Sequence, residues 1–323
     1  MIKEVSQIKK ITVLGAGTMG PGIAQSYAMG GFAVTVWTRS EDTLNNARVA
    51  VAEGFKSFLD EGLLSYEKVD EFERSIDYTT DFEKAVKDAD FIQETIVENK
   101  DAKLELFENL LKYIKDDCIV ASNTSALNIF EIVPKEILKN IVIAHWYAPA
   151  QLIPLVEVVK AVDAPEEYGQ ITKQLLEMCG KKAILMKKFI PGYIVNRLQM
   201  CLNQEVFNLL DNDYCTPQDI DDAAKASFIP RAVVLGLCQR IDFGGLDMTA
   251  SNFKNKSYTF PPEKDMPITL EKHIEKGELG FKAGKGFYDY SGLNSEEVIA
   301  KRDAQLFEIF KVAKKFTDDP LSK

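Results

Sequence analysis

A histidine and a glutamate stand in two neighbouring apolar segments and could together move a proton. His145 follows the β-branched run at 141–144, and Glu157 lies inside Leu-Val-Glu-Val-Val at 155–159. Both runs favour buried strands, and the prolines between them favour a short loop. A carboxylate in so apolar a run needs a partner, and beside an imidazole it would leave the outer ring nitrogen free as a base near neutral pH. Alternatively, His145 is a core histidine and Glu157 faces solvent on an edge strand.

A glycine-rich turn near the N-terminus could bind a dinucleotide. Ile-Thr-Val-Leu at 11–14 predicts a strand, which leads through Gly-Ala-Gly-Thr-Met-Gly at 15–20 into a helix-forming segment. Gly15 permits the tight turn, Gly17 lets the backbone approach a pyrophosphate, and Gly20 lets the helix pack on the strand. The helix N-terminus supplies donors for the phosphates. We therefore expect five residues of this turn to bind the cofactor: Gly15, Gly17, Thr18, Met19 and Gly20.

The end of the second expected strand bears on the choice of cofactor. Folds that bind NAD usually place Asp or Glu here to hold the ribose 2′-hydroxyl, but strand 33–37 leads into Thr38, Arg39 and Ser40. Without the acid, a 2′-phosphate is not repelled, and Arg39 could bind it. Alternatively, Arg39 stacks on adenine while NAD binds. We expect NAD(P), with a preference for NADP, and assign Thr38 and Arg39 to the cofactor site.

Strands alternating with helices predict an α/β fold built on a doubly wound parallel sheet, in which the loops at the carboxyl ends of the strands hold the ligand. Glu98, Ser125 and His145 all fall at such ends. We predict an NAD(P)-binding Rossmann domain over residues 1–188 and an all-α dimerisation domain over residues 189–323.

The second half of the chain has apolar residues at helical spacing. Those from Ile194 to Leu209 predict a long buried helix with Asn196 in its first turn. A helical domain with this much apolar surface usually buries it against a copy of itself, so we expect a homodimer.

Composition excludes several classes of partner. The 323 residues carry a net charge of −10, which argues against a nucleic-acid partner. No segment approaches the roughly 20 apolar residues of a membrane span, and five cysteines without Cys-x-x-Cys spacing fit a reducing compartment, so we expect a cytoplasmic protein without a membrane partner. With only two histidines, a histidine-rich metal site is excluded, and we expect no metal.

Seven motifs, in order, make the chain resemble the 3-hydroxyacyl-CoA dehydrogenase family over nearly its whole length. They are Gly-Ala-Gly-Thr-Met-Gly at 15–20, Ile-Val-Glu-Asn at 96–99, Ser-Asn-Thr-Ser at 122–125, His145 with Pro149, Leu-Val-Glu-Val at 155–158, Pro-Gly-Tyr-Ile-Val-Asn-Arg at 191–197 and Gly-Lys-Gly-Phe-Tyr at 284–288. The resemblance implies a dinucleotide-binding domain followed by a helical dimerisation domain. It also implies fatty acid metabolism, with NAD(P)-dependent interconversion of L-3-hydroxyacyl and 3-oxoacyl compounds such as 3-hydroxybutyryl-CoA.

The resemblance gives individual positions their roles. His145 matches the general base that removes the 3-hydroxyl proton, and Glu157 matches its carboxylate partner. Ser125 and Asn196 match groups that hydrogen-bond the reacting oxygen, although a turn residue and a helix cap are the alternatives. Three further positions match residues that contact the cofactor or close over the substrate: Glu98, Lys103 and Asn123.

Departures from the family pattern keep the small-molecule substrate open. The usual His-Phe-Phe-Asn-Pro reads His-Trp-Tyr-Ala-Pro here, so Ala148 replaces an amide. Where the acyl-CoA enzymes carry Lys-Lys-Gly to meet the CoA nucleotide, this chain has Asp-Glu-Gly at 60–62, with only Lys56 nearby. Carboxylates there repel a phosphate, which favours a free 3-hydroxy acid, as in the carnitine and L-gulonate 3-dehydrogenases. A non-catalytic protein, like a lens crystallin that resembles this family, is a further alternative.

Overall fold

The computed structural model describes residues 2–256, 259–262, 264–318 and 321 of the chain. The chain divides into two compact units, Met1–Ile194 and Val195–Lys323. The predicted boundary after residue 188 lies a few residues before this division and stays a prediction.

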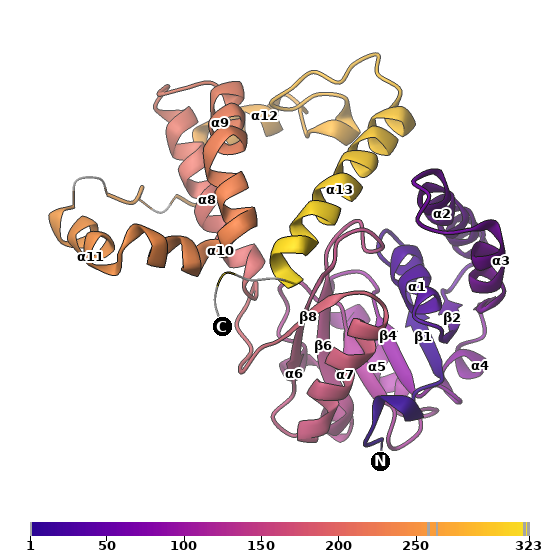
Figure 1. The fold of residues 1–323 in the computed structure, drawn as a ribbon. Coiled ribbons are helices and arrows are strands. Elements are labelled where there is room, and N and C mark those ends of the chain that lie inside the picture. Colours follow the sequence, from indigo (N-terminus) through magenta and orange to yellow (C-terminus); the bar gives the residue numbers. More distant parts are fainter. Residues whose placement is uncertain (1, 257–258, 263, 319–320, 322–323) are drawn as a thin grey trace. The chain divides into compact units, whose positions relative to one another are not determined.

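The first unit is built on one eight-stranded sheet, in the order β3-β2-β1-β4-β5-β6-β7-β8. Strands β1 to β6 run parallel, β7 is antiparallel to β6, and β8 is parallel to β7 (Figure 1). The strands are β1 Lys10–Leu14, β2 Ala33–Trp37, β3 Ile76–Thr79, β4 Phe91–Glu94, β5 Ile119–Ser122, β6 Ile141–Trp146, β7 Leu155–Lys160 and β8 Lys182–Leu185.

The predicted parallel sheet is therefore correct for six strands, and the last two reverse direction. The reason is the connection between β6 and β7, residues 147–154, because a parallel crossover needs about a dozen residues or more. Every residue of β5 and β6 is buried. Strands so apolar throughout belong in the middle of a sheet that is covered on both faces.

Helices connect these strands, and most begin at a residue whose side chain caps the first turn. Ser40, Ser65, Asp81 and Asn99 each accept a hydrogen bond from a backbone N–H three residues later. The helices of this unit are α1 Gly20–Met29, α2 Glu41–Asp60, α3 Tyr66–Arg74, α4 Phe82–Val86, α5 Lys100–Leu110, α6 Ile129–Ile132 and α7 Glu166–Met178, with short 3-10 turns η1 Val5–Gln7 and η2 Lys135–Asn140.

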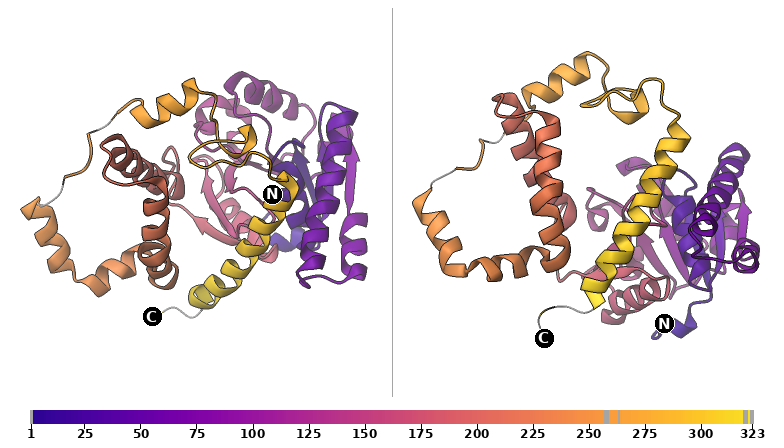
Figure 2. Two further views of the ribbon diagram at one scale, coloured as in Figure 1. Left: turned by 90° about the horizontal axis from the view of Figure 1, so that it is seen from above. Right: turned by 45° about the horizontal axis from the view of Figure 1, so that its top comes forward.

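The second unit is helical, as expected. In Figures 1 and 2, α11 projects away from α8 and α10. The elements are α8 Val195–Asp211, α9 Pro217–Ala223, a π-helical turn η3 Ala224–Phe228, α10 Ile229–Gly244, α11 Leu246–Asn255, α12 Ile268–Glu275, a 3-10 turn η4 Phe281–Ala283 and α13 Ser295–Asp318.

One expectation about this unit is wrong for the single chain. The helix expected to be buried is α8, but Leu198 is 42% exposed and Leu202 is 52% exposed. Phe307 is the only buried residue among those described in this unit. Helical spacing of apolar residues identifies the face that would be covered, but not whether this chain covers it. Among the described residues, no helix is long and apolar enough to cross a membrane.

Candidate active site

His145 and Glu157 form a direct cross-strand pair at the carboxyl edge of the first unit. The antiparallel register places them opposite each other on β6 and β7, and His145 Nδ1 lies 3.2 Å from Glu157 Oε2. Both are buried, His145 at 4% and Glu157 at 0% exposure. The predicted contact is present. Because the carboxylate occupies Nδ1, it favours the tautomer whose Nε2 can accept a proton, and the described residues offer Nε2 no hydrogen bond.

Two tyrosines flank the imidazole, and the sequence reasoning missed both. The ring centroid of His145 lies 4.6 Å from that of Tyr147 and 4.7 Å from that of Tyr193. The Tyr193 hydroxyl donates to the Thr124 carbonyl at 2.7 Å, whereas the Tyr147 hydroxyl donates to Glu157 Oε2 at 2.6 Å. The signal in the sequence was a tyrosine two residues after the histidine, which places both side chains on one face of an extended segment.

Glu157 tolerates full burial because donors meet both of its oxygens. Oε2 faces His145 and Tyr147, and Oε1 accepts a hydrogen bond from the Ile194 amide at 2.9 Å. A buried carboxylate with this many partners is satisfied rather than strained. Glu157 therefore presents a fixed negative charge to the inner nitrogen of the imidazole.

Glu98 organises the loop after β5 that carries Ser125. Its Oε1 accepts hydrogen bonds from the Ser125 amide at 2.8 Å, the Ala126 amide at 2.9 Å and the Thr124 hydroxyl at 2.8 Å. Burial alone would raise the pKa of Glu98, but these bonds and the charge of Lys103 outweigh it and lower the pKa to about 2. Ser125 is thus held in place by a carboxylate that stays ionised.

A buried lysine forms an ion pair with Glu98. Lys103 is 1% exposed, with Nζ 2.6 Å from Glu94 Oε1 and 3.4 Å from Glu98 Oε2. Glu94 is itself fully buried and also accepts hydrogen bonds from the Ser122 hydroxyl and the Ile96 amide. In this arrangement Lys103 bridges two carboxylates. The predicted contacts of Glu98 and Lys103 with the cofactor stay predictions.

Asn123 connects the ends of two neighbouring strands. Its Oδ1 accepts a hydrogen bond from the Trp146 amide at 2.7 Å, so it fixes the backbone just after His145. Asn196 lies in the first turn of α8, in the second unit. The predicted roles of Asn123 toward the cofactor and of Ser125 and Asn196 toward the reacting oxygen stay predictions.

The glycine turn after β1 has the shape that a pyrophosphate needs. Gly15 has a φ of +112°, and a Cβ there would lie 2.7 Å from the Thr95 carbonyl oxygen. A Cβ on Gly20 would lie 2.0 Å from the Gly15 carbonyl oxygen, whereas one on Gly17 would meet nothing within 4 Å. No side chain caps the start of α1, where Met19 is the N-cap residue and Thr18 is exposed. These residues fit a dinucleotide, because free backbone donors face open space.

The end of β2 carries an exposed cation. Thr38 is partly exposed, and Arg39 is exposed and makes no hydrogen bond or ion pair with the described residues. Ser40 is already engaged, because its hydroxyl oxygen accepts a hydrogen bond from the Thr43 amide at 3.3 Å and caps α2. Of the three polar residues here, only Thr38 and Arg39 remain available to a nucleotide.

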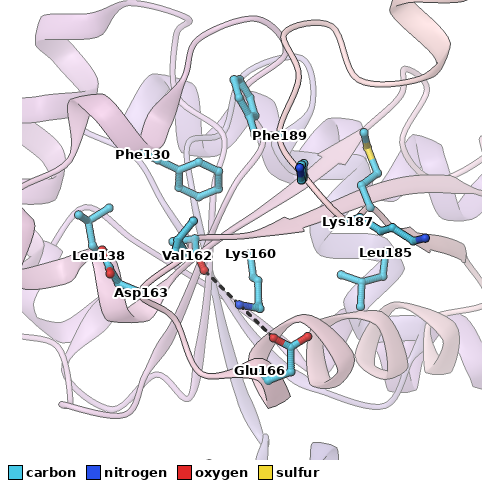
Figure 3. Close-up of a pocket in the computed structure, with 12 residues that line it drawn as sticks. Phe130, Leu138, Lys160, Val162, Asp163, Glu166, Leu185, Lys187 and Phe189 are labelled. Carbon is cyan, nitrogen blue, oxygen red and sulfur yellow. Dashed lines mark hydrogen bonds and ion pairs between the residues drawn. The ribbon is translucent and has the colours of Figure 1, made fainter.

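A pocket of about 760 Å³ lies on the first unit (Figure 3). Its Lys160 forms an ion pair with Glu166 at 3.1 Å. None of the predicted site residues lines it, so it does not mark the candidate active site. The lining residues are Phe130, Leu138, Lys160, Ala161, Val162, Asp163, Glu166, Leu185, Met186, Lys187, Lys188 and Phe189.

Known proteins resemble the chain along most of its length. The 5-formyl-3-hydroxy-2-methylpyridine 4-carboxylate 5-dehydrogenase of Mesorhizobium japonicum is 27% identical over 310 residues, which span 94% of this chain and 98% of that protein. A crystal structure of an enzyme with this activity, described as an NAD+-dependent dismutase, matches with a TM-score of 0.85 at 25% identity and covers 95% of this chain and 99% of that one. The probable 3-hydroxybutyryl-CoA dehydrogenase of Bacillus subtilis is 32% identical over 286 residues, 88% of this chain and 98% of that protein.

Family models match both halves of the chain. Residues 10–189 match the NAD-binding domain of 3-hydroxyacyl-CoA dehydrogenase, and residues 192–290 match its C-terminal domain. The N-terminal match includes the glycine turn, the Glu98 loop and the pair His145 and Glu157. The chain belongs to the 3-hydroxyacyl-CoA dehydrogenase family and is an oxidoreductase that acts on a CH–OH group.

Proposed function

We propose that this chain interconverts a 3-hydroxy group and a 3-oxo group on a small acid with NAD, and that His145 is the general base. The observation that carries this proposal is the pair His145 and Glu157 at the same sheet edge as the glycine turn. Strands β1, β4, β5 and β6 lie side by side, so about 14 Å separates the turn from His145, at about 4.8 Å per strand. An extended dinucleotide can reach across this edge.

The residues divide the chemistry between them. His145 Nε2 accepts the proton of the substrate hydroxyl, and Glu157 stabilises the imidazolium that forms. A nicotinamide bound at the glycine turn would supply the hydride acceptor in oxidation and the hydride donor in reduction. Ser125, held by Glu98, would donate a hydrogen bond to the reacting oxygen as it becomes a carbonyl. In the reverse direction, protonated His145 returns the proton to the oxygen.

The acyl thioester expected from the family competes with a free acid as substrate, and one observation favours the free acid. Asp60 is exposed in the last turn of α2, and Glu61 is the C-cap residue of that helix. The carboxyl end of a helix is already electronegative, so these two carboxylates add repulsion against a nucleotide phosphate. The dehydrogenase of Mesorhizobium japonicum is named for a pyridine carboxylate, with no CoA in its name.

The test is NADH oxidation by the purified protein with acetoacetyl-CoA and with a panel of free 3-oxo acids. We expect turnover of at least one free acid, with a kcat/KM well above that for the thioester. Fast turnover of acetoacetyl-CoA alone would refute the choice of a free acid but keep the reaction. NADH binding without turnover of any of these compounds would refute the reaction and favour a non-catalytic role.

A charge-reversed variant tests whether the end of α2 excludes CoA. Asp60→Lys with Glu61→Lys should lower the KM for acetoacetyl-CoA and leave the KM for a free acid unchanged. Asp42→Lys with Glu53→Lys is the matched control, because it reverses the same number of charges and both residues are exposed earlier on the same helix. An equal fall in the KM for acetoacetyl-CoA in the control would show that the net charge of the protein, and not the end of α2, sets this KM.

The predicted preference for NADP is a separate proposal, since the comparisons support NAD. The exposed guanidinium of Arg39, which forms no ion pair with a described residue, supports use of NADP in addition. Arg39→Ala should lower kcat/KM with NADPH about tenfold more than with NADH, as expected for loss of one charge-assisted bond. Equal losses with both cofactors would favour stacking of Arg39 on adenine.

We also propose that a second copy of the chain covers the exposed apolar side chains of α11, in the second unit. In α11, Leu246 is 66% exposed, Met248 58% and Phe253 69%. Singly exposed apolar residues are common, but several on one short helix are typical of an interface. Light scattering should give twice the 36.2 kDa mass of one chain. The mass of a single chain would refute this proposal.

A further inference from the structure

Tyr147 shares an oxygen of Glu157 with the candidate general base. We propose that Tyr147 is a positioning residue that sets the pH at which His145 takes up its proton, and that it acts through Glu157. This rests on the function proposed above, in which His145 is the base. No role was assigned to Tyr147 from the sequence, and the family pattern has phenylalanine at its position.

The geometry favours the phenol in the competition for this oxygen. The Tyr147 hydroxyl lies 2.6 Å from Glu157 Oε2, whereas His145 Nδ1 lies 3.2 Å from the same atom. Short hydrogen bonds to a carboxylate are the strong ones. The second oxygen is bonded to the Ile194 amide, so Glu157 cannot turn that oxygen to the imidazole without losing this bond. His145 therefore faces a carboxylate whose charge is already partly neutralised.

The phenol acts as a donor throughout the working pH range. Burial, together with the hydrogen bond and charge of Glu157, raises the pKa of Tyr147 far above its usual value. It keeps its proton and can only donate that proton to Glu157 or release the bond. Tyr147 therefore influences His145 through a constant hydrogen bond and does not titrate alongside it.

The other ionisable groups that face this cluster are engaged elsewhere. Tyr193 packs on the opposite side of the imidazole, but its hydroxyl bonds the Thr124 carbonyl. Burial and the charges of Glu98, Glu157 and Glu94 raise the pKa of Tyr193, so this phenol keeps its proton, and Lys103 bridges Glu94 and Glu98. None of these groups hydrogen-bonds Glu157 or His145 in the described part of the chain. Of the two tyrosines beside the imidazole, Tyr147 is the one that donates a hydrogen bond to Glu157.

Removal of the phenol oxygen should make His145 more basic. In Tyr147→Phe, the charge on Glu157 is shared with the imidazole alone, so the imidazolium is better stabilised and His145 should hold its proton to higher pH. The acid limb of the pH profile of kcat/KM for oxidation should move to higher pH as well. A side chain that only fills space would leave this limb in place.

The experiment is an NMR titration of histidine-labelled full-length protein. The chain contains two histidines, so His273→Gln assigns the His145 signal. Tyr193→Phe is the matched control, because it also removes one phenol oxygen beside the same ring but none from Glu157. We expect the titration of His145 to move to higher pH in Tyr147→Phe and to stay unchanged in Tyr193→Phe. An unchanged His145 pKa in Tyr147→Phe, or an equal shift in Tyr193→Phe, would overturn the proposal.

A double-mutant comparison tests whether Tyr147 acts on His145 through Glu157. In a Glu157→Gln background, Tyr147→Phe should no longer move the pKa of His145, because the shared charge is gone. A shift that persists in this background would overturn the proposed route. The titration needs no turnover, so its outcome is separate from that of the proposed function. Inactive protein that shows the expected titration would refute the dehydrogenase reaction but not the coupling.

Discussion

Glu98 should stabilise the first unit through its charge. It bonds the amides of Ser125 and Ala126 and the hydroxyl of Thr124, and its pKa falls from 4.5 to about 2. A carboxyl whose pKa is lowered on folding adds stability above its unfolded pKa, and this is lost as pH falls through its folded pKa. Glu98→Gln keeps the shape and removes the charge, so it should be less stable than wild type at neutral pH.

The magnitude follows from the shift in pKa. A change from 4.5 to about 2 corresponds to about 3 kcal/mol before screening. The side chain is 34% exposed, and solvent reduces such an interaction, so we expect Glu98→Gln to lose about 1 to 2 kcal/mol near pH 7. The difference should shrink below about pH 4.5 and vanish below about pH 2, where wild type is also protonated.

Tryptophan fluorescence during urea unfolding measures this difference for the unit concerned. Both tryptophans of the chain, Trp37 and Trp146, lie in the first unit. Glu105→Gln is the control, because Glu105 is exposed on α5 and makes no hydrogen bond or ion pair with the described residues. A loss in Glu98→Gln that stays constant from pH 7 to pH 3, or an equal loss in the control, would refute the electrostatic reasoning.

Two further predictions concern a buried lysine and the glycine turn. Lys181 donates to the carbonyls of Ala150 and Ile153, and burial lowers its pKa to about 8. Between pH 8 and 10.5 the unfolded chain binds more protons, so the destabilisation of Lys181→Met should grow with pH in urea unfolding, and a constant difference would contradict this. Gly17→Ala should keep the fold and weaken NAD binding in calorimetry, whereas Gly20→Ala, whose Cβ would lie 2.0 Å from a carbonyl oxygen, should unfold the turn. Unweakened NAD binding by folded Gly17→Ala would show that the pyrophosphate lies elsewhere.

The sequence predicted the features of the site that depend on local pattern. The glycine turn, the strands on either side of residues 147–154 and the contact between His145 and Glu157 follow from residue type, spacing and the cost of a buried charge. Each of these follows from a short run of sequence. For the same reason, the helical nature of the second half was predictable from its periodicity.

Features that depend on three-dimensional packing were not predictable from the sequence. The bridge from Lys103 to Glu94 and Glu98 joins α5 to β4 and the following loop, and nothing in their spacing indicates that the lysine is buried. Tyr193 reaches the imidazole from a segment far from His145 in the chain, whereas Tyr147 is only two residues away from it. The burial expected for α8 was wrong because an apolar stripe does not say which molecule covers it.

The central claim is that His145 moves the proton of the reacting hydroxyl. The direct measurement is kcat for His145→Gln with the best substrate of the panel, together with the affinity for NAD. A positioned general base contributes about 10²–10⁴-fold, so kcat should fall by that factor while NAD affinity is unchanged. A kcat within tenfold of wild type would contradict the account, and the pair of His145 and Glu157 would then be structural.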